Sequence, residues 1–180
     1  AVVFSAGNQG SLGSESPADN PDAFAAGAVD ASLAVASSSS RGPSSCDGTL
    51  FPEVVAPGVN VKTSDLTFGG VFPDSYATVS GTSFAAPHVS ATIALLLQSN
   101  PAASVSDIEQ ALTEGAFDLG TAGADNESGY GLVDAVASND LLAGGIVPNC
   151  VARRRAGVTI RVTFRPPGSP RPPRSPPPVR

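Results

Sequence analysis

The stretch SGTSFAAPHV, residues Ser80 to Val89, contains the residues best suited to covalent chemistry. If Ser83 stands where a strand passes into a helix, Gly81 permits a sharp turn and Ala85 and Ala86 permit close packing. The helix N-terminus would add free N–H groups and the positive end of its dipole. A serine hydroxyl there could attack a carbonyl carbon and have the resulting oxyanion stabilised. The alternative is an ordinary serine at a helix start, which GTS alone favours.

His88 is the single histidine of the sequence, which excludes any mechanism or metal site that needs two histidines from these residues. It follows Ser83 by five residues on the same expected helix, about 140° around and roughly 7.5 Å along the axis. Side chains with that spacing do not face each other. We therefore expect His88 to be a packing residue and not the base for Ser83.

No other base is evident among the sixteen acidic residues. Asp47, Asp65 and Asp74 lie in expected turns, where we expect them to be solvated. Asp19 and Asp22 lie in a loop that could bind calcium, although their spacing matches no recognised calcium motif. We assign no metal site, expect the chemistry to require no cofactor, and leave a structural calcium ion open.

Short apolar runs precede the candidate nucleophile and predict strands. These are Ala1–Phe4, Phe24–Asp30 and Glu53–Ala56, each followed by residues typical of turns. The β-favouring residues at 59–80, with Gly69 and Gly70 in their middle, predict a hairpin.

Helical patterns begin where this hairpin ends. Thr82–Ser99 is too long for a strand and predicts a buried helix that stops at Asn100-Pro101. Ser104–Gly115 predicts an amphipathic helix with Ser106 as its cap. The residues on its apolar face are Ile108, Ala111 and Leu112. Leu132–Asn139 predicts a third helix, and strands alternating with helices predict the α/β class with a largely parallel sheet.

The charges divide the chain into an acidic body and a basic tail. Residues 1–150 hold all sixteen acids against Arg41 and Lys62, whereas residues 151–180 hold eight Arg, eight Pro and no acid. We predict a body domain at 1–145 and a tail at 146–180, which its prolines keep disordered or extended. An acidic body disfavours nucleic acid as its partner.

The tail leaves three interpretations open. It is a flexible linker, a contact segment that binds polyanions or an SH3-type domain, or the product of a shifted reading frame. Cys46 and Cys150 have no metal-type spacing and leave a disulfide or two free thiols open.

The sequence contains neither a predicted membrane span nor a predicted signal peptide. No run reaches the roughly 18 apolar residues of a membrane span, and AVVFSAGNQG lacks the features of a signal peptide. A chain that starts at Ala1 without any methionine is expected to be processed or incomplete.

The segment GTSFAAPHVSA resembles the nucleophile segment of subtilisin-like serine peptidases, whose usual form is GTSMAAPHVAG. Phe84 stands where Met is usual, and Ser90 and Ala91 follow His88 and Val89. Other family landmarks occur in the family's order: SAGNQG, FAAGAVD, SSSSRGP, PEVVAPG and GYGLVDA. Together they span residues 1 to about 140.

The resemblance implies a three-layer α/β fold with a mainly parallel sheet, incomplete at its N-terminus. Ser83 would be the nucleophile, with the side-chain amide of Asn8 and the Ser83 N–H binding the oxyanion. The backbone at Ser5, Ala6 and Gly7 would form one wall of the substrate pocket. The triad Asp and His would precede Asn8, outside this sequence.

The resemblance also implies a protein or peptide substrate and an extracellular or cell-envelope location. Glu53 matches a position where relatives often carry an acid near a cation site. Nothing in the sequence indicates the oligomeric state.

Two hypotheses follow for the body of the chain. The first is the C-terminal half of the catalytic domain of a subtilisin-like serine endopeptidase, inactive on its own because it lacks the base. The second is a catalytically silent fragment or pseudoenzyme that at most binds peptides. A third hypothesis makes the tail the working part, as a polyanion or SH3-type ligand.

Overall fold

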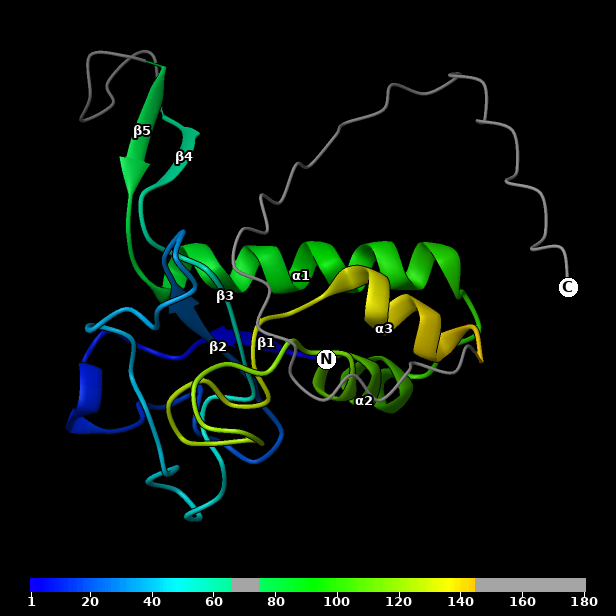
Figure 1. Cartoon of the computed structure of the whole chain (residues 1–180), viewed down its shortest axis with the longest axis horizontal. Helices are drawn as coiled ribbons and strands as arrows, with labels where there is room; N and C mark the ends of the chain where they lie inside the picture. Colours follow the sequence, from blue (N-terminus) through cyan, green and yellow to red (C-terminus); the bar gives the residue numbers. More distant parts are fainter. Residues whose placement is uncertain (66–74, 145–180) are drawn as a thin grey trace, which may run out of the picture.

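Three short strands form the parallel sheet at the centre of the chain (Figure 1). We describe residues 1–65 and 75–144 of a computed structural model; the tail at 146–180 and the expected turn at Gly69-Gly70 lie outside them. β1 (Val3–Ser5) and β3 (Val54–Pro57) flank β2 (Phe24–Val29), with Val3 opposite Phe24 and Ala26 opposite Val54. The expected strands are confirmed to within two residues at each end.

Helix α1 (Thr82–Ser99) has the bounds that the sequence predicts and packs against all three strands of this sheet. The expectation of a buried helix is wrong for the described residues, because only one face packs on the sheet: Thr82, Ala85, Val89, Thr92 and Leu96 are buried, whereas Leu95 and Leu97 are exposed. Helix α2 (Val105–Glu114) is amphipathic as expected, with Ile108, Ala111 and Leu112 buried. The α/β class with a mainly parallel sheet is thereby confirmed.

Two helix starts differ from the prediction. Ser104, not Ser106, caps α2, because its hydroxyl accepts the Asp107 N–H while the Asp107 carboxylate accepts the Ser104 N–H. Helix α3 spans Ala135–Leu142 and so begins three residues after Leu132. Leu132 is held in extended backbone instead, because it bridges Val55 and Phe117.

The main core lies between the sheet and the helices. Its fully buried members are Phe24, Ala26, Ala28, Val54, Ala56, Ala85, Val89, Leu96, Ile108 and Leu112. The other face of the sheet carries smaller clusters around Phe51 and Leu132, which loop residues supply. In the described part of the chain, therefore, helices cover one face of the sheet and loops cover the other.

A separate hairpin connects the sheet to α1. Strands β4 (Val61–Ser64) and β5 (Tyr76–Val79) pair antiparallel, which confirms the expected hairpin, and they project away from the sheet (Figure 1). β5 leads through Ser80 and Gly81 directly into α1.

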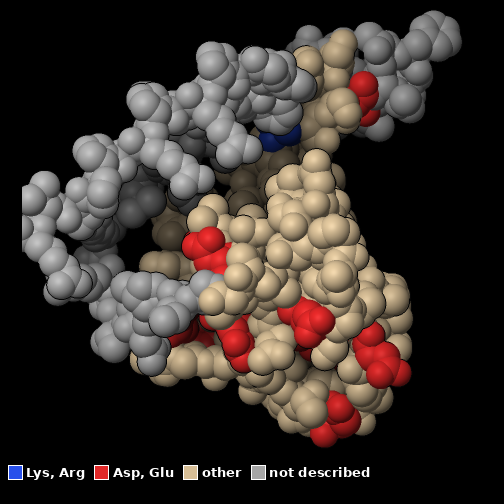
Figure 2. Space-filling view, turned by 90° about the vertical axis from the view of Figure 1, so that its right-hand side faces the viewer, with Lys and Arg blue, Asp and Glu red and all other residues tan. Residues whose placement is uncertain are grey.

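The described surface is acidic, as the composition predicts. Figure 2 shows carboxylates scattered over one face of the molecule rather than gathered in one patch. Over residues 1–65 and 75–144, no helix is long and apolar enough to cross a membrane. Cys46 is exposed with a free thiol, and Cys150 lies outside the described residues.

Candidate active site

The carboxyl ends of the parallel strands meet the N-terminus of α1. The Gly58 N–H donates to the Val29 carbonyl at 3.0 Å, and the Gly81 N–H donates to the Gly58 carbonyl at 2.7 Å. The loop at Ser5–Asn8 leaves β1 at the same edge of the sheet. Ligand sites of open α/β sheets lie at this edge, because the loops that follow the strands converge there.

Two glycines make this close approach sterically feasible. A Cβ on Gly58 would lie 2.6 Å from the Ala28 Cβ and 3.0 Å from the Gly81 carbonyl oxygen. Gly81 has φ +145°, in the region that favours glycine. A side chain at position 58 would therefore push the residues before α1 away from β2, whereas one at position 81 would strain the backbone there.

Thr82 joins the start of α1 to the loop after β1. Its N–H donates to Asn8 Oδ1 at 3.1 Å. Its hydroxyl accepts the Gly7 N–H at 3.2 Å and lies within donating distance of the Gly7 carbonyl (3.1 Å) and Asn8 Oδ1 (3.3 Å). Thr82 is fully buried, so these bonds are shielded from water.

The Thr82 N–H also decides how the Asn8 carboxamide is turned. A backbone donor must face the oxygen of the amide, so the Asn8 Nδ2 group points away as a donor. Nδ2 has no hydrogen-bond partner in residues 1–65 and 75–144, and Asn8 is exposed. A Cβ on Gly81 would lie 3.7 Å from Nδ2, so the free donor stands beside the first turn of α1.

Ser83 is the second residue of α1 and is exposed. The residue at the N-cap is Gly81, with no side-chain cap, so Ser83 does not cap the helix, and the alternative of an ordinary serine at a helix start stays open. No hydrogen bond of the Ser83 hydroxyl occurs within the described residues, and its N–H belongs to the helix turn that lacks intrahelical acceptors. A free hydroxyl, a free N–H and the free Asn8 amide therefore lie at one helix terminus.

His88 does not serve Ser83. It is exposed, and its Nδ1 lies 2.7 Å from the Phe84 carbonyl oxygen of its own helix. The expectation that it is not the base agrees with this geometry, whereas the expected packing role is wrong for the described residues.

The expected pocket wall has mixed exposure. Ser5 and Gly7 are half-buried, and Ala6 is fully buried with its N–H bonded to the Ala26 carbonyl at 3.0 Å. The Ala6 side chain belongs to the cluster on the loop-covered face of the sheet. Ala6 is therefore covered as a whole in this structure, and of the three residues only Ser5 and Gly7 are partly accessible.

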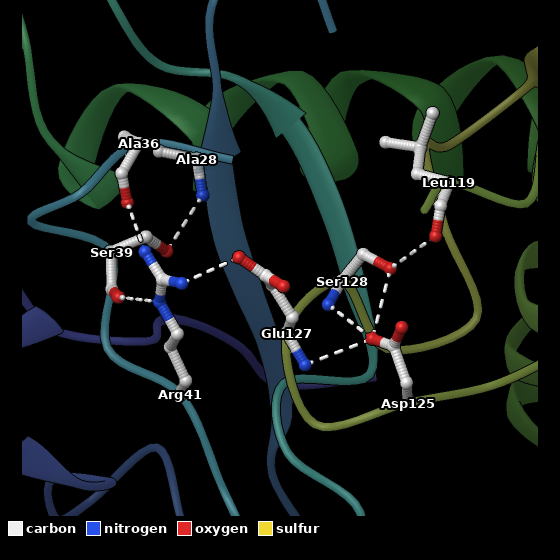
Figure 3. Close-up of polar contacts among 8 residues, drawn as sticks. All are labelled: Ala28, Ala36, Ser39, Arg41, Leu119, Asp125, Glu127 and Ser128. Carbon is white, nitrogen blue, oxygen red and sulfur yellow. Dashed lines mark hydrogen bonds and ion pairs between the residues drawn. The ribbon is translucent and has the colours of Figure 1, made fainter. Parts of the chain in front are cut away.

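Sequence reasoning missed the residues that support the loop from the other side. The Ser40 hydroxyl accepts the Gln9 N–H at 3.0 Å, and the Ser40 N–H donates to the Gly7 carbonyl at 3.0 Å. Arg41 beside it donates to the Ala36 and Ser39 carbonyls (Figure 3). Both residues belong to the SSSSRGP segment, for which the sequence indicates a match to the family but no supporting role.

The three acids that the sequence offered for a cation differ in burial and in hydrogen-bond partners. Glu53 is half-buried and its Oε2 accepts the Ala25 N–H at 2.6 Å. Burial raises the pKa of its carboxyl, and the Ala25 hydrogen bond opposes that rise. Asp19 is buried and bonds to Ser14, whereas Asp22 is exposed. The described residues contain no group of three His, Cys, Asp or Glu placed to hold a metal ion.

Residues 1–131 match the family model described as the subtilase family. The chain is 39% identical to bacillopeptidase F of Bacillus subtilis (strain 168) over 148 residues, which is 80% of this chain and 10% of that protein. It is 38% identical to subtilisin BL of Lederbergia lenta over 137 residues, 76% of this chain and 45% of that protein. It is 42% identical to the minor extracellular protease Epr of Bacillus subtilis (strain 168) over 81 residues, 45% of this chain and 12% of that protein. The chain thus spans less than half the length of each of these relatives.

Proposed function

The chain belongs to the subtilase family, and we therefore propose that it carries the nucleophile and the oxyanion-binding side of a serine endopeptidase. The observation that carries the proposal is the contact between Thr82 and Asn8, which occupies Asn8 Oδ1 and leaves Nδ2 as a free donor near Gly81, two residues before Ser83. Family membership alone would leave the roles of these residues unassigned.

In the proposed reaction, the Ser83 hydroxyl oxygen attacks the carbonyl carbon of the scissile peptide bond and loses its proton to a general base. The carbonyl oxygen becomes an oxyanion that accepts hydrogen bonds from Asn8 Nδ2 and the Ser83 N–H. The C–N bond then breaks, and the leaving amine takes the proton from the base. Water hydrolyses the Ser83 ester by the same sequence of steps.

The base must come from outside these 180 residues. His88 is the single histidine of the sequence and faces away from Ser83 on the same helix. A histidine, with a carboxylate to orient it, would be brought to Ser83 by chain that this sequence does not contain. On its own, the 180-residue chain is then expected to cleave peptides slowly or not at all.

The substrate class follows from the family and from the backbone at the site. The proteases among the relatives act on polypeptides by name, and the backbone at residues 5–7 runs along the edge where a peptide would lie. The name of the Epr protease and the acidic surface support an extracellular location. The reaction as written needs no cofactor, and a structural calcium ion remains a separate proposal.

A fluorophosphonate probe tests the proposal, because it reacts with serines that a base has activated. The probe is applied to the 180-residue chain and to the longest product of the reading frame that contains it, with Ser83→Ala of each as the control. We expect labelling of Ser83 in the longer product and little in the short chain. A folded longer product that stays unlabelled contradicts the enzyme, and fast stoichiometric labelling of the short chain contradicts the external base.

A catalytically silent peptide-binding protein is the second candidate. It is favoured by one observation, the lack of a histidine within reach of Ser83. It predicts that peptides bind the longer product while neither hydrolysis nor labelling occurs. The hypothesis that the tail binds polyanions or an SH3-type domain concerns residues outside the described ones and stays a prediction.

A further inference from the structure

The loop that carries Asn8 lies against a second loop, Ser37–Ser40, as well as against Thr82. The Ser40 N–H donates to the Gly7 carbonyl and the Ser40 hydroxyl accepts the Gln9 N–H, both at 3.0 Å. These bonds are on the residues immediately before and after Asn8. One side chain and its own backbone therefore hold both flanks of the candidate oxyanion donor.

The two loops are closely packed. Ser40 is fully buried. A Cβ on Gly7, which has φ +104°, would lie 2.8 Å from the Ser40 Oγ, and a Cβ on Gly10 would lie 2.6 Å from the Ser37 carbonyl oxygen. The two loops are thus so close that a side chain at either glycine would require a shift of the backbone.

Arg41 holds the second loop in shape. Its guanidinium donates to the Ala36 carbonyl at 3.1 Å and pairs with Glu127, as Figure 3 shows. The Arg41 side chain is 22% exposed and that of Glu127 is 59% exposed, so the bonds of Arg41 to the Ala36 and Ser39 carbonyls are the more shielded part of this contact. Glu127 is itself fixed by a turn in which Asp125 Oδ1 accepts its N–H.

We propose that Ser40 is a positioning residue for Asn8, and that Arg41 supports it. Thr82 sets the rotation of the Asn8 carboxamide, and Ser40 sets where its backbone stands. A donor fixed from both sides needs no rearrangement when the oxyanion forms, which is the condition under which such a donor accelerates acyl transfer most. The inference rests on the proposed function, because it assigns Asn8 the role of oxyanion donor.

Ser40→Ala tests the proposal in the longest product of the reading frame, with Ser39→Ala as the matched control. Ser39 is the adjacent residue, equally buried, and its hydroxyl accepts the Ala28 N–H of β2 instead of a bond in the Asn8 loop. Both variants lose one buried hydrogen bond, so we expect similar falls in the thermal midpoint. Only Ser40→Ala should lower kcat, by about tenfold or more, with KM within about twofold, because small displacements of a catalytic group cost large factors. Equal kcat values for the two variants overturn the proposal.

A double-mutant cycle separates positioning from a general loss of structure. If Ser40 acts through Asn8, Ser40→Ala should have no further effect on kcat in an Asn8→Ala background. Additive effects overturn the proposal. If Ser40→Ala does not fold, Arg41→Lys replaces it in the same cycle, because lysine keeps the charge but loses the planar fork of donors.

A spectroscopic measurement keeps the inference distinct from the proposed activity. In the 180-residue chain labelled with ¹⁵N, Ser40→Ala should shift the Nδ2 amide signals of Asn8 and speed their exchange with water, and Ser39→Ala should not. Unchanged Asn8 signals in Ser40→Ala overturn the positioning role even where the protein hydrolyses nothing. Shifted signals in a protein without activity support positioning while the proposed function fails.

Discussion

The backbone N–H of Thr82 donates to Asn8 Oδ1 at 3.1 Å across 74 positions of sequence. This bond joins the loop after β1 to the first residue of α1 and leaves the other end of the Asn8 amide free. Since Ser83 follows Thr82 directly, any displacement of one loop relative to the helix would change the distance between the hydroxyl and the amide donor.

In the longest product of the reading frame, Ser83→Ala should abolish probe labelling and hydrolysis without destabilising the fold. The Ser83 side chain is exposed and forms no hydrogen bond in the described residues, so its removal should change the free energy of unfolding by less than about 0.5 kcal/mol. Denaturant unfolding and probe labelling measure the two effects on the same sample. Ser90→Ala, at another exposed serine of α1, should leave labelling unchanged.

Asn8→Ala should lower kcat by about 10²- to 10³-fold and leave KM nearly unchanged, because the lost donor acts on charge that develops only in the transition state. Steady-state kinetics of the longest product of the reading frame provide the measurement. Gln9→Ala is the matched control, since Gln9 is also exposed and only its backbone N–H and carbonyl form hydrogen bonds, to Ser40 and Leu12. Equal kinetics for the two variants would remove Asn8 from the proposed role.

Glu53→Gln should stabilise the protein increasingly as the pH rises. Burial raises the pKa of Glu53 above its ordinary value of 4.5, so the folded state binds this proton more tightly than the unfolded state does. The contribution of the protonated Glu53 carboxyl to the free energy of unfolding is complete below pH 4.5, and it is lost as the pH rises through the raised pKa. Glutamine keeps an acceptor for the Ala25 N–H and carries no charge to desolvate.

Thermal midpoints of the two proteins between pH 4 and 8 test this effect of Glu53. The thermal midpoint of Glu53→Gln minus that of the parent chain should increase as the pH increases. Asp140→Asn is the control, because Asp140 is exposed on α3 and its side chain makes no hydrogen bond in the described residues. A constant difference between Glu53→Gln and the parent chain would contradict the burial effect.

Ser104→Ala should lower the free energy of unfolding by about 1 kcal/mol, the usual effect of losing an N-cap. The Ser104 hydroxyl accepts the Asp107 N–H, and the Asp107 carboxylate accepts the Ser104 N–H in return. Ser106→Ala, inside the first turn of α2, should cost much less. Chemical denaturation of both variants provides the measurement, and a larger effect at Ser106 would contradict the observed cap.

Local patterns were sufficient to predict most of the elements. The run FAAGAV is apolar throughout and forms the fully buried central strand, and Thr82–Ser99 forms a helix with the expected bounds. The prediction failed at Ser106 and Leu132, where the local pattern offered two neighbouring choices. At α2 the reciprocal bonds of Ser104 and Asp107 decided the start, and at Leu132 the bridge to Val55 in a distant strand did.

The site was predicted in part for a similar reason. The composition and order of residues determined that Ser83 follows a glycine at a helix start, that Asn8 follows a short strand, and that His88 cannot face Ser83. These are properties of neighbours along the chain, which backbone geometry alone restricts. The family resemblance connected Ser83 to Asn8 before any contact was visible.

Only the tertiary structure decided which residues hold these groups in place. Thr82, Ser40 and Arg41 carry no local signal for such a role, because their partners lie far away in sequence: Asn8, Gln9 and Glu127. A hydrogen bond between distant segments depends on the packing of the sheet against α1 and on the loops that cover its edge. The sequence by itself therefore determined the reactive groups and the elements that bear them, whereas the packing of those elements decided the direction in which the Asn8 amide points.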